Sequence, residues 1–495
     1  MGGAYKNLIC TRRLVLWGAG VLALAAAGSG WWFWSVINPA GLKGEIEAYL
    51  SEEFEGEVTI DTLEGRLFPR VGVSGGGMVV RVKGRTDVPP LVTIERFEIR
   101  GSFRQFMQRP RHVSEVRLQR LRVQIPPGDD GDAPDIKQTD AEEIAAARKY
   151  EAVIVDRFEA PDTVLTIIPR EAGKPPKVFT IHQLVMDSVG STQTIPYLAT
   201  LTNPISKGEI EASGTFGPWN VAHPEGTRVT GKYLLANADL GTINGLSGIL
   251  KSEGDFKGPL NRIEVQGTTE TPDFRLDAGG KAVPLYARFT AVVDGSHGDT
   301  YLNQVDAKFL ETELTAKGLV IGLEGVRGRQ VEVDVTISKG RIEDLLKVAI
   351  DSDTPLVGPA QLQARLVIPA ERGRKVIDEL KLRGSFGLTR ARFTDKSVQR
   401  RLVGLSLHGQ GKASGQPVAD VLSDLKGRLV VDNAVVTFSQ LRFGVPGALV
   451  ALTGRYGLRS EALDFKGELR REAGTVLPIK ITGTRKVPRF GLNLF

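Results

Sequence analysis

Reactive side chains are scarce in this chain of 495 residues, which has one cysteine, five histidines and four methionines. Cys10 lies near the N-terminus, so the rest of the chain can form no disulfide and carries no thiol nucleophile. No HExxH motif occurs, and no two histidines are close enough in sequence to make a local zinc pair. We therefore expect no metal and no cofactor, and a fold stabilised by packing and backbone pairing. The histidines are His112, His182, His223, His297 and His408.

Catalytic motifs are also missing. Residues Gly72–Gly76 fit the pattern G-x-S-x-G, but a hydrolase elbow requires a helix after the serine. Here Met78–Val82 alternates like a strand, so a turn explains the glycines around Ser74 better. No glycine-rich segment has the spacing of a phosphate-binding loop. We predict that the protein is not an enzyme and has no catalytic residues.

The chain has no basic stripe of the kind that binds nucleic acid. Its net charge is +6, and three of the cations, Lys6, Arg12 and Arg13, lie within the first 13 residues, where there is no acid. Setting these three aside leaves about +3 on the rest of the chain, which is too balanced for a nucleic-acid-binding surface. We expect no nucleic-acid partner.

Long hydrophobic runs are absent except at residues 14–37, which contain no charged side chain. With a rise of about 1.5 Å per residue, this segment would form a helix of about 36 Å, enough to cross a hydrocarbon core of about 30 Å. Basic residues stay on the cytoplasmic side, so Lys6, Arg12 and Arg13 predict a cytoplasmic tail at residues 1–13 and a single-pass anchor. The aromatic residues expected at the far membrane interface are Trp31, Trp32, Phe33 and Trp34.

Two other interpretations of this segment stay open. A basic start, an apolar run and the small residues Ala25–Ala27 also fit a cleaved signal peptide. The stretch Thr11–Leu14 resembles a twin-arginine export signal. The apolar run continues beyond Ala27 through four aromatic residues, which is long enough for a stable anchor, so we predict a transmembrane helix.

After the anchor, the hydrophobic period changes from helical to two. Residues 38–54 have the apolar spacing of a helix, whereas from Val58 onward apolar and polar residues alternate as in strands. We expect residues 74–77 to form a hairpin turn between two strands. The phase of the alternation slips by one residue between Leu118 and Leu121, which predicts a β-bulge.

The clearest alternation occurs in two segments of the C-terminal half. If both are strands, their apolar positions share one face and their polar positions face water. Helical breaks are expected at residues 342–350, 395–405 and 417–425. The apolar positions that we predict to line an inner face are Val331, Val333, Val335, Ile337, Leu362, Ala364, Leu366 and Ile368.

The pattern as a whole predicts a mainly β protein with a few short helices. Roughly 25–30 strands of typical length would fit the remainder of the chain. So few helices cannot cover the apolar faces of so many strands, which must meet another sheet, fold on themselves or enclose something apolar. The expected segments are 1–13 (cytoplasmic tail), 14–37 (transmembrane helix), 38–128 (N-terminal β segment), 129–150 (linker and short helix), 151–250 (middle β segment) and 251–495 (C-terminal β region).

Both ends of the chain resemble the AsmA-like family of bacterial envelope proteins. Ile37–Val80 is similar to the start of that family, where an uncleaved anchor is followed by an asparagine-proline step, a short helix and a strand pair. Gly340–Pro369, Ala391–Gly411 and Leu477–Phe495 are similar to phrases of the family's C-terminal region. Residues 129–250 match least.

The resemblance implies an inner-membrane-anchored protein whose bulk is periplasmic. The implied fold is one N-terminal transmembrane helix followed by a long curled antiparallel β-sheet groove with an apolar inner face. The implied function lies in outer-membrane biogenesis, by conducting phospholipid along the groove between membranes, with acyl chains covering the apolar face. The alternative is a periplasmic scaffold that assists outer-membrane protein assembly or targeting without lipid transport. Its partner would be an outer-membrane or inner-membrane protein.

Overall fold

The fold is known from a computed structural model of the whole chain. Within the residues it describes, no helix is both long enough and apolar enough to cross a membrane. The predicted anchor at residues 14–37, its flanking Lys6, Arg12 and Arg13, and the aromatic cluster at residues 31–34 lie outside the described residues. The described residues are 39–53, 56–66, 71–82, 89–106, 111–125, 153–167, 177–190, 194–203, 207–218, 226–242, 246–276, 280–295, 299–323, 326, 329–350, 353–370, 376–410, 422–471, 474, 476–485 and 487–492.

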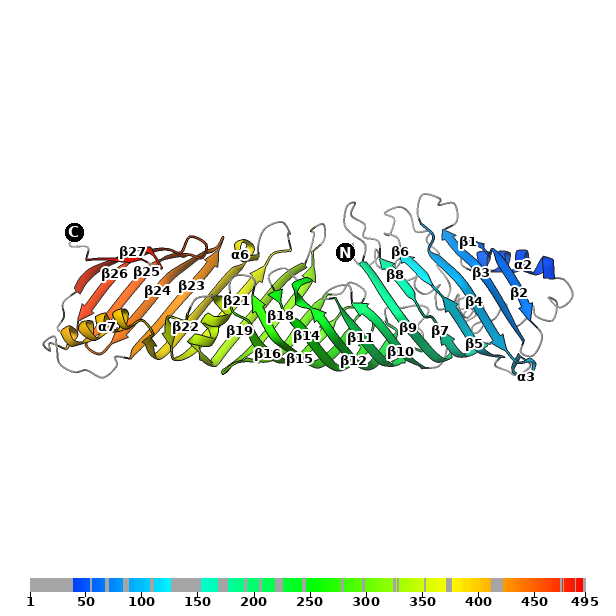
Figure 1. Cartoon of the computed structure of the whole chain (residues 1–495), viewed down its shortest axis with the longest axis horizontal. Helices are drawn as coiled ribbons and strands as arrows, with labels where there is room; N and C mark the ends of the chain where they lie inside the picture. Colours follow the sequence, from blue (N-terminus) through cyan, green and yellow to red (C-terminus); the bar gives the residue numbers. More distant parts are fainter. Residues whose placement is uncertain are drawn as a thin grey trace. The chain divides into compact units, whose positions relative to one another are not determined.

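The described chain is mainly β, with a few short helices, as the sequence predicts. It divides into two units, within each of which successive strands run side by side (Figure 1). Unit 1 comprises residues 1–238, 253–265 and 294–296. Unit 2 comprises residues 239–252, 266–293 and 297–495.

The described part of unit 1 begins with helix α2 (Pro39–Glu53) and also contains the single turn α3 (Phe103–Phe106). Its strands are β1 (Gly56–Thr59), β2 (Thr62–Arg66), β3 (Val71–Val82), β4 (Val92–Gly101), β5 (Arg111–Gln119), β6 (Arg122–Ile125), β7 (Val153–Glu159), β8 (Thr163–Ile167), β9 (Lys177–Val189), β10 (Ile195–Asn203), β11 (Gly208–Phe216) and β12 (Arg228–Asp239), with β12 ending at the boundary.

The sheet of unit 1 is not wholly antiparallel, which corrects the prediction. Strand β5 pairs in parallel with β7, and β6 pairs in parallel with β8. The other recorded pairings of β1 to β12 are antiparallel. The β-bulge predicted between Leu118 and Leu121 is wrong, because β5 and β6 pair with β4 in one unbroken register. The strand is instead interrupted at Arg120, whose φ is 51°.

The core of unit 1 is one buried cluster that extends from α2 and β1 to β10. Ile46 and Leu50 of α2 pack into one cluster with Val58 and Ile60, and burying each such side chain contributes about 1.5–3 kcal/mol. The helix also protects the edge of the sheet. The Glu47 carboxylate accepts a hydrogen bond from the Ile60 N–H at 2.7 Å, so an edge donor is satisfied within the chain.

The glycine run at residues 74–77 is not a turn, contrary to the prediction. Strand β3 continues through it, because β2 pairs with β3 on one side and β4 on the other. Phe97 of β4 lies directly opposite Gly75, and a Cβ at Gly75 would lie 2.5 Å from the Phe97 ring. The glycine is therefore needed for the space it leaves to a buried aromatic ring.

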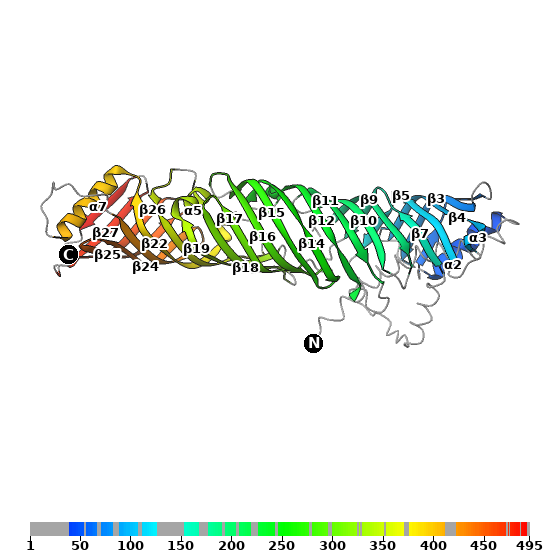
Figure 2. The same ribbon diagram turned by 90° about the horizontal axis from the view of Figure 1, so that it is seen from below.

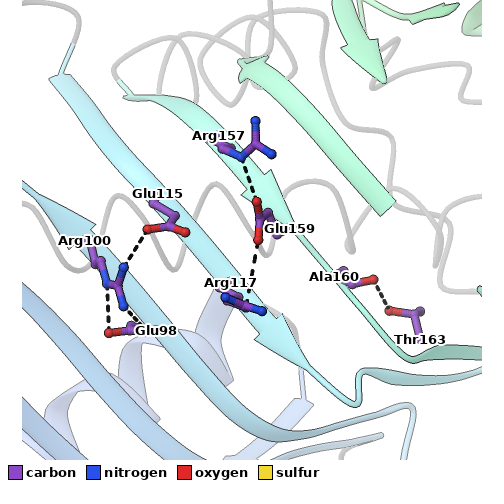
Figure 3. Close-up of polar contacts among 8 residues, drawn as sticks. All are labelled: Glu98, Arg100, Glu115, Arg117, Arg157, Glu159, Ala160 and Thr163. Carbon is purple, nitrogen blue, oxygen red and sulfur yellow. Dashed lines mark hydrogen bonds and ion pairs between the residues drawn. The ribbon is translucent and has the colours of Figure 1, made fainter. Parts of the chain in front are cut away.

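The outer face of unit 1 carries ion pairs rather than apolar contacts. Arg100 of β4 contacts Glu115 of β5 at 3.0 Å, and Glu159 of β7 contacts Arg157 at 2.7 Å and Arg117 at 3.9 Å (Figure 3). Exposed pairs of this kind contribute about 0–1 kcal/mol each. They identify this face as the wet one and are consistent with the core lying on the other.

Unit 2 forms one antiparallel ladder in chain order. Each strand from β16 to β28 pairs with its neighbours, with the two-residue strand β20 placed beside β22. Strands β14 (Ile249–Pro259) and β15 (Ile263–Leu276) are divided between the units. The other elements are η2 (Leu240–Thr242), β13 (Leu246–Ser247), β16 (Val283–Val293), β17 (Thr300–Phe309), β18 (Thr312–Gly322), β19 (Arg329–Arg341), α5 (Ile342–Ala349), β20 (Leu356–Val357), β21 (Pro359–Ile368), α6 (Val376–Glu379), β22 (Lys381–Phe393), α7 (Lys396–Gly409), β23 (Ser423–Asp432), β24 (Val435–Val445), β25 (Ala448–Gly457), β26 (Ala462–Arg471), β27 (Val476–Thr484) and β28 (Pro488–Leu492).

Two of the three expected helical breaks are present in unit 2. Helices α5 and α7 occupy the segments predicted at residues 342–350 and 395–405. The third, predicted at residues 417–425, is wrong over its described end, because β23 already begins at Ser423. There the alternating residues of β23 pair with β22, and this pairing overrides the local helical spacing.

Candidate apolar binding face

The eight predicted inner-face residues come together in the structure. They lie on the adjacent strands β19 and β21, and each residue of one strand is directly opposite a residue of the other. Directly opposed residues share a face of the sheet, so the eight side chains form one continuous apolar patch. The opposed pairs are Val331 with Ile368, Val333 with Leu366, Val335 with Ala364, and Ile337 with Leu362.

The patch continues across the neighbouring strands as three apolar rows, each defined by residues that are directly opposed from one strand to the next. No row contains a charged side chain. The first row is Gly318, Val333, Leu366, Leu382, Val431, Val436, Tyr456, Leu463 and Gly483; the second is Ala316, Val335, Ala364, Gly384, Leu429, Phe438, Gly454, Phe465 and Ile481; the third is Ile337, Leu362, Phe386, Gly427, Leu441, Leu452, Gly467 and Ile479.

Every residue of these rows is buried or partly buried, although no second sheet of the described unit 2 packs on them. Ile337 is 2% exposed and belongs to a dry core, whereas the other seven predicted residues are partly exposed. The residues between them on β21, such as Gln361, Gln363 and Arg365, are exposed. Partial burial without a covering layer indicates a groove-like sheet, whose apolar side chains shield one another.

Aromatic rings in the second and third rows lean toward one another across intervening strands. The ring centroids of Phe386 and Phe438 are 6.3 Å apart and edge-to-face, and those of Phe438 and Phe465 are 5.7 Å apart. Glycines lie beneath the rings: Gly427 is directly opposite Phe386, and Gly454 lies between Phe438 and Phe465. A Cβ at Gly427 would lie 2.5 Å from the Phe386 ring, so the glycines allow the rings to lie flat across the sheet.

The segments Gly214–Pro218, Gly254–Pro259 and Gly384–Gly387 share a glycine–phenylalanine pattern, which predicts each phenylalanine at a strand end before a turn. Of the three phenylalanines, only Phe216 ends its strand. Phe256 and Phe386 lie within β14 and β22. What identifies these phenylalanines as packing residues is a glycine on the paired strand. That glycine can be recognised only when the register of the two strands is known.

Two helices, α5 and α7, pack along one margin of this face in unit 2. Ile342 and Leu345 of α5 pack against Ala360 and Leu388 near the ends of β21 and β22. Val403 of α7 packs against the buried cluster formed by β24 to β26, and Figure 2 shows α7 beside these strands. The helices therefore cover one margin of the apolar rows.

Helix α5 is fixed by a buried carboxylate. Asp344 is 4% exposed, and its Oδ2 accepts hydrogen bonds from the Glu311 N–H at 3.0 Å and the Thr312 hydroxyl at 2.9 Å. The neighbouring Glu343 accepts from the Gly358 N–H and from Arg341. Burial alone raises the pKa of Glu343, but these hydrogen bonds outweigh it and hold the pKa below its ordinary value.

The side chains of this face are apolar apart from the hydroxyl of Tyr456, which interacts with Arg485. Its rows offer no carboxylate, imidazole or amine, and no group of three or more metal-ligating side chains occurs within the described chain. No family model, curated protein or solved structure matches this chain.

Proposed function

We propose that this chain is an inner-membrane-anchored periplasmic protein of outer-membrane biogenesis, and that it conducts phospholipid along its apolar rows. The observation that carries the proposal is the continuity of the three rows across β19 to β27 without a charged side chain. A closed core would need a covering layer, and the described residues of unit 2 provide one only at the margin. Acyl chains supply such a layer.

The proposed mechanism is passive sliding of acyl chains along the rows, with headgroups left in water. A methylene that leaves a membrane for water costs about 0.8 kcal/mol. Apolar contact along the rows offsets most of this cost at each strand. The rows run across the strands, so a chain that follows them advances from one strand to the next.

Mass spectrometry of lipids retained by the purified full-length protein tests the proposal. We expect phospholipid in stoichiometric amounts from the wild type. We expect much less from a Leu429→Asp variant, because that substitution places a charge in the second row. The control is Ala451→Asp, an exposed position on the opposite face of β25. Equal lipid retention by all three folded proteins would refute the proposal.

A second candidate function is a periplasmic scaffold for outer-membrane protein assembly. An unpaired strand edge supports it. Among the described strands, β28 pairs only with β27, so its other edge is open to strand addition. The two functions differ in the same experiment. A scaffold gives crosslinks to a protein partner along β28 and retains no phospholipid.

A further inference from the structure

A cleft with a volume of about 510 Å³ lies over the polar positions of unit 2, and Val335, Ala364, Gly384 and Leu429 of the second row also contribute to its lining. This size falls within the range of roughly 300–1,000 Å³ that is usual for small-molecule sites. Strands β19 and β21 to β24 line it. Two lines of opposed residues form its floor, namely Asp334, Arg365 and Arg383 in one, and Gln363, Ser385 and Arg428 in the other.

The arginines of this cleft are arranged at a cost to the sheet. Arg365 is directly opposite Arg383, and like charges in directly opposed positions destabilise an antiparallel pair. Arg428 is opposite Ser385, two residues along β22 from Arg383, so a third positive charge lies on the diagonal. Only one acid, Asp334, lines the cleft.

Acidic side chains compensate only one of the three arginines. Arg365 pairs with Glu332 at 2.5 Å and with Asp334 at 3.9 Å. Arg383 and Arg428 are exposed, and within the described part of the chain their guanidinium groups have no ion-pair or hydrogen-bond partner. The cleft therefore holds two uncompensated guanidinium groups on adjacent strands.

We propose that this cleft binds a phosphomonoester, held by Arg383 and Arg428. A guanidinium presents a planar fork of donors that matches phosphate oxygens, and the two groups together supply two positive charges. A phosphomonoester carries about −1.5 to −2 near pH 7, whereas a single carboxylate would leave one arginine uncompensated. The bound anion also removes the repulsion that the register imposes. The ligand is either a soluble phosphomonoester or the headgroup of a lipid, and the site is independent of the function proposed above.

Calorimetric titration of the full chain in neutral detergent micelles with glycerol 3-phosphate tests the soluble source. Micelles containing phosphatidic acid, compared with micelles containing phosphatidylcholine, test the lipid source. We expect Arg383→Gln and Arg428→Gln each to weaken binding about tenfold, because each removes a charge-assisted contact. The matched control is Arg455→Gln, an exposed arginine of β25 outside the cleft, which should bind like the wild type.

Thermal unfolding gives a second readout, which measures the stability of each variant rather than the heat of binding. Without ligand, Arg383→Gln should melt no lower than the wild type, since it relieves the repulsion with Arg365. With ligand, the wild type and Arg455→Gln should gain more melting temperature than either cleft variant. Binding to glycerol 3-phosphate, or to phosphatidic acid alone, supports the site and assigns its source. No binding to either probe, or equal binding by all variants, overturns the proposal.

Discussion

Val333 of β19 and Leu366 of β21 lie directly opposite each other in the first apolar row. Replacing both with aspartate places two carboxylates side by side on the proposed path of an acyl chain. Both positions are partly exposed, so the carboxylates stay in contact with water and the sheet is expected to remain folded. The perturbation therefore acts on passage along the row rather than on the fold.

The size of the effect follows from the spacing of the strands. Strands lie about 4.8 Å apart, so two charged positions on neighbouring strands deprive on the order of four methylenes of apolar contact, at about 0.8 kcal/mol each. The full sum is about 3 kcal/mol, and because the rows are partly exposed to begin with, we expect between half and all of it, about 1.5–3 kcal/mol. Since about 1.4 kcal/mol changes a rate tenfold, transfer should be about 10- to 100-fold slower.

Transfer of a fluorescent phospholipid between donor and acceptor vesicles measures this rate, with the full chain anchored in the donor vesicles. The control is Ala451→Asp/Thr453→Asp, which adds two carboxylates at exposed positions on the other face of β25. Circular dichroism establishes that both variants are folded. An apolar setting raises the pKa of an aspartate, so the defect of the row variant should shrink as the pH is lowered.

A wild-type transfer rate in the folded row variant would refute the reasoning. So would an equal loss in the control, because that would place the effect in net charge rather than in the row.

Three further predictions concern stability. Gly427→Ala should lower the free energy of unfolding by about 1–3 kcal/mol, because its Cβ would lie 2.5 Å from the Phe386 ring, whereas Gly387→Ala, with open space around it, should change it by less than about 0.5 kcal/mol. Asp344→Ala should cost about 2–4 kcal/mol in urea unfolding, because the buried Thr312 hydroxyl and the part-buried Glu311 N–H lose their acceptor. The lowered pKa of Glu343 contributes stability that is present above its ordinary pKa of 4.5 and is lost as the pH falls through the folded value, so Glu343→Gln should flatten the melting-temperature profile below pH 4.5.

Each of these predictions has an outcome that contradicts it. Equal stability losses for the two glycine variants would show that ring packing is not the cause. Asp353, which is fully exposed, is the control for Asp344, and an Asp353→Ala variant that is equally destabilised would exclude the buried hydrogen bonds as the reason. An unchanged pH profile in the Glu343 variant would assign the acid sensitivity to other carboxylates.

The alternation along β19 and β21 was readable from the sequence because polar residues separate the apolar ones; on β21 these polar residues are exposed, whereas Glu332 and Asp334 of β19 are partly buried. This period is enough to assign a strand and its wet face. It also predicts that Val333 and Leu366 each lie on an apolar face. It does not predict that the two residues lie opposite each other. Burial is less predictable: Ile337 has the same local pattern as Val335 but is 2% exposed, because its depth depends on neighbours that lie elsewhere in the chain.

The parts that sequence reasoning missed depend on pairing between distant segments. A glycine run such as residues 74–77 looks like a turn until Phe97 is known to lie across it. The aromatic contacts of Phe438 with two other strands cannot be read from its own segment. The parallel pairing of β5 with β7 likewise follows from the path of the chain rather than from local propensity.

Because each row crosses the strands, no continuous piece of the chain encodes it. A substitution alters one position of a row, but a one-residue deletion turns every residue that follows it within its strand to the other face of the sheet. Removing Asp334, for example, would turn Val335 toward water and bring Thr336 into its place. Natural variation in these strands should therefore be rich in exchanges among aliphatic residues and poor in length changes, with insertions and losses confined to the connections between strands.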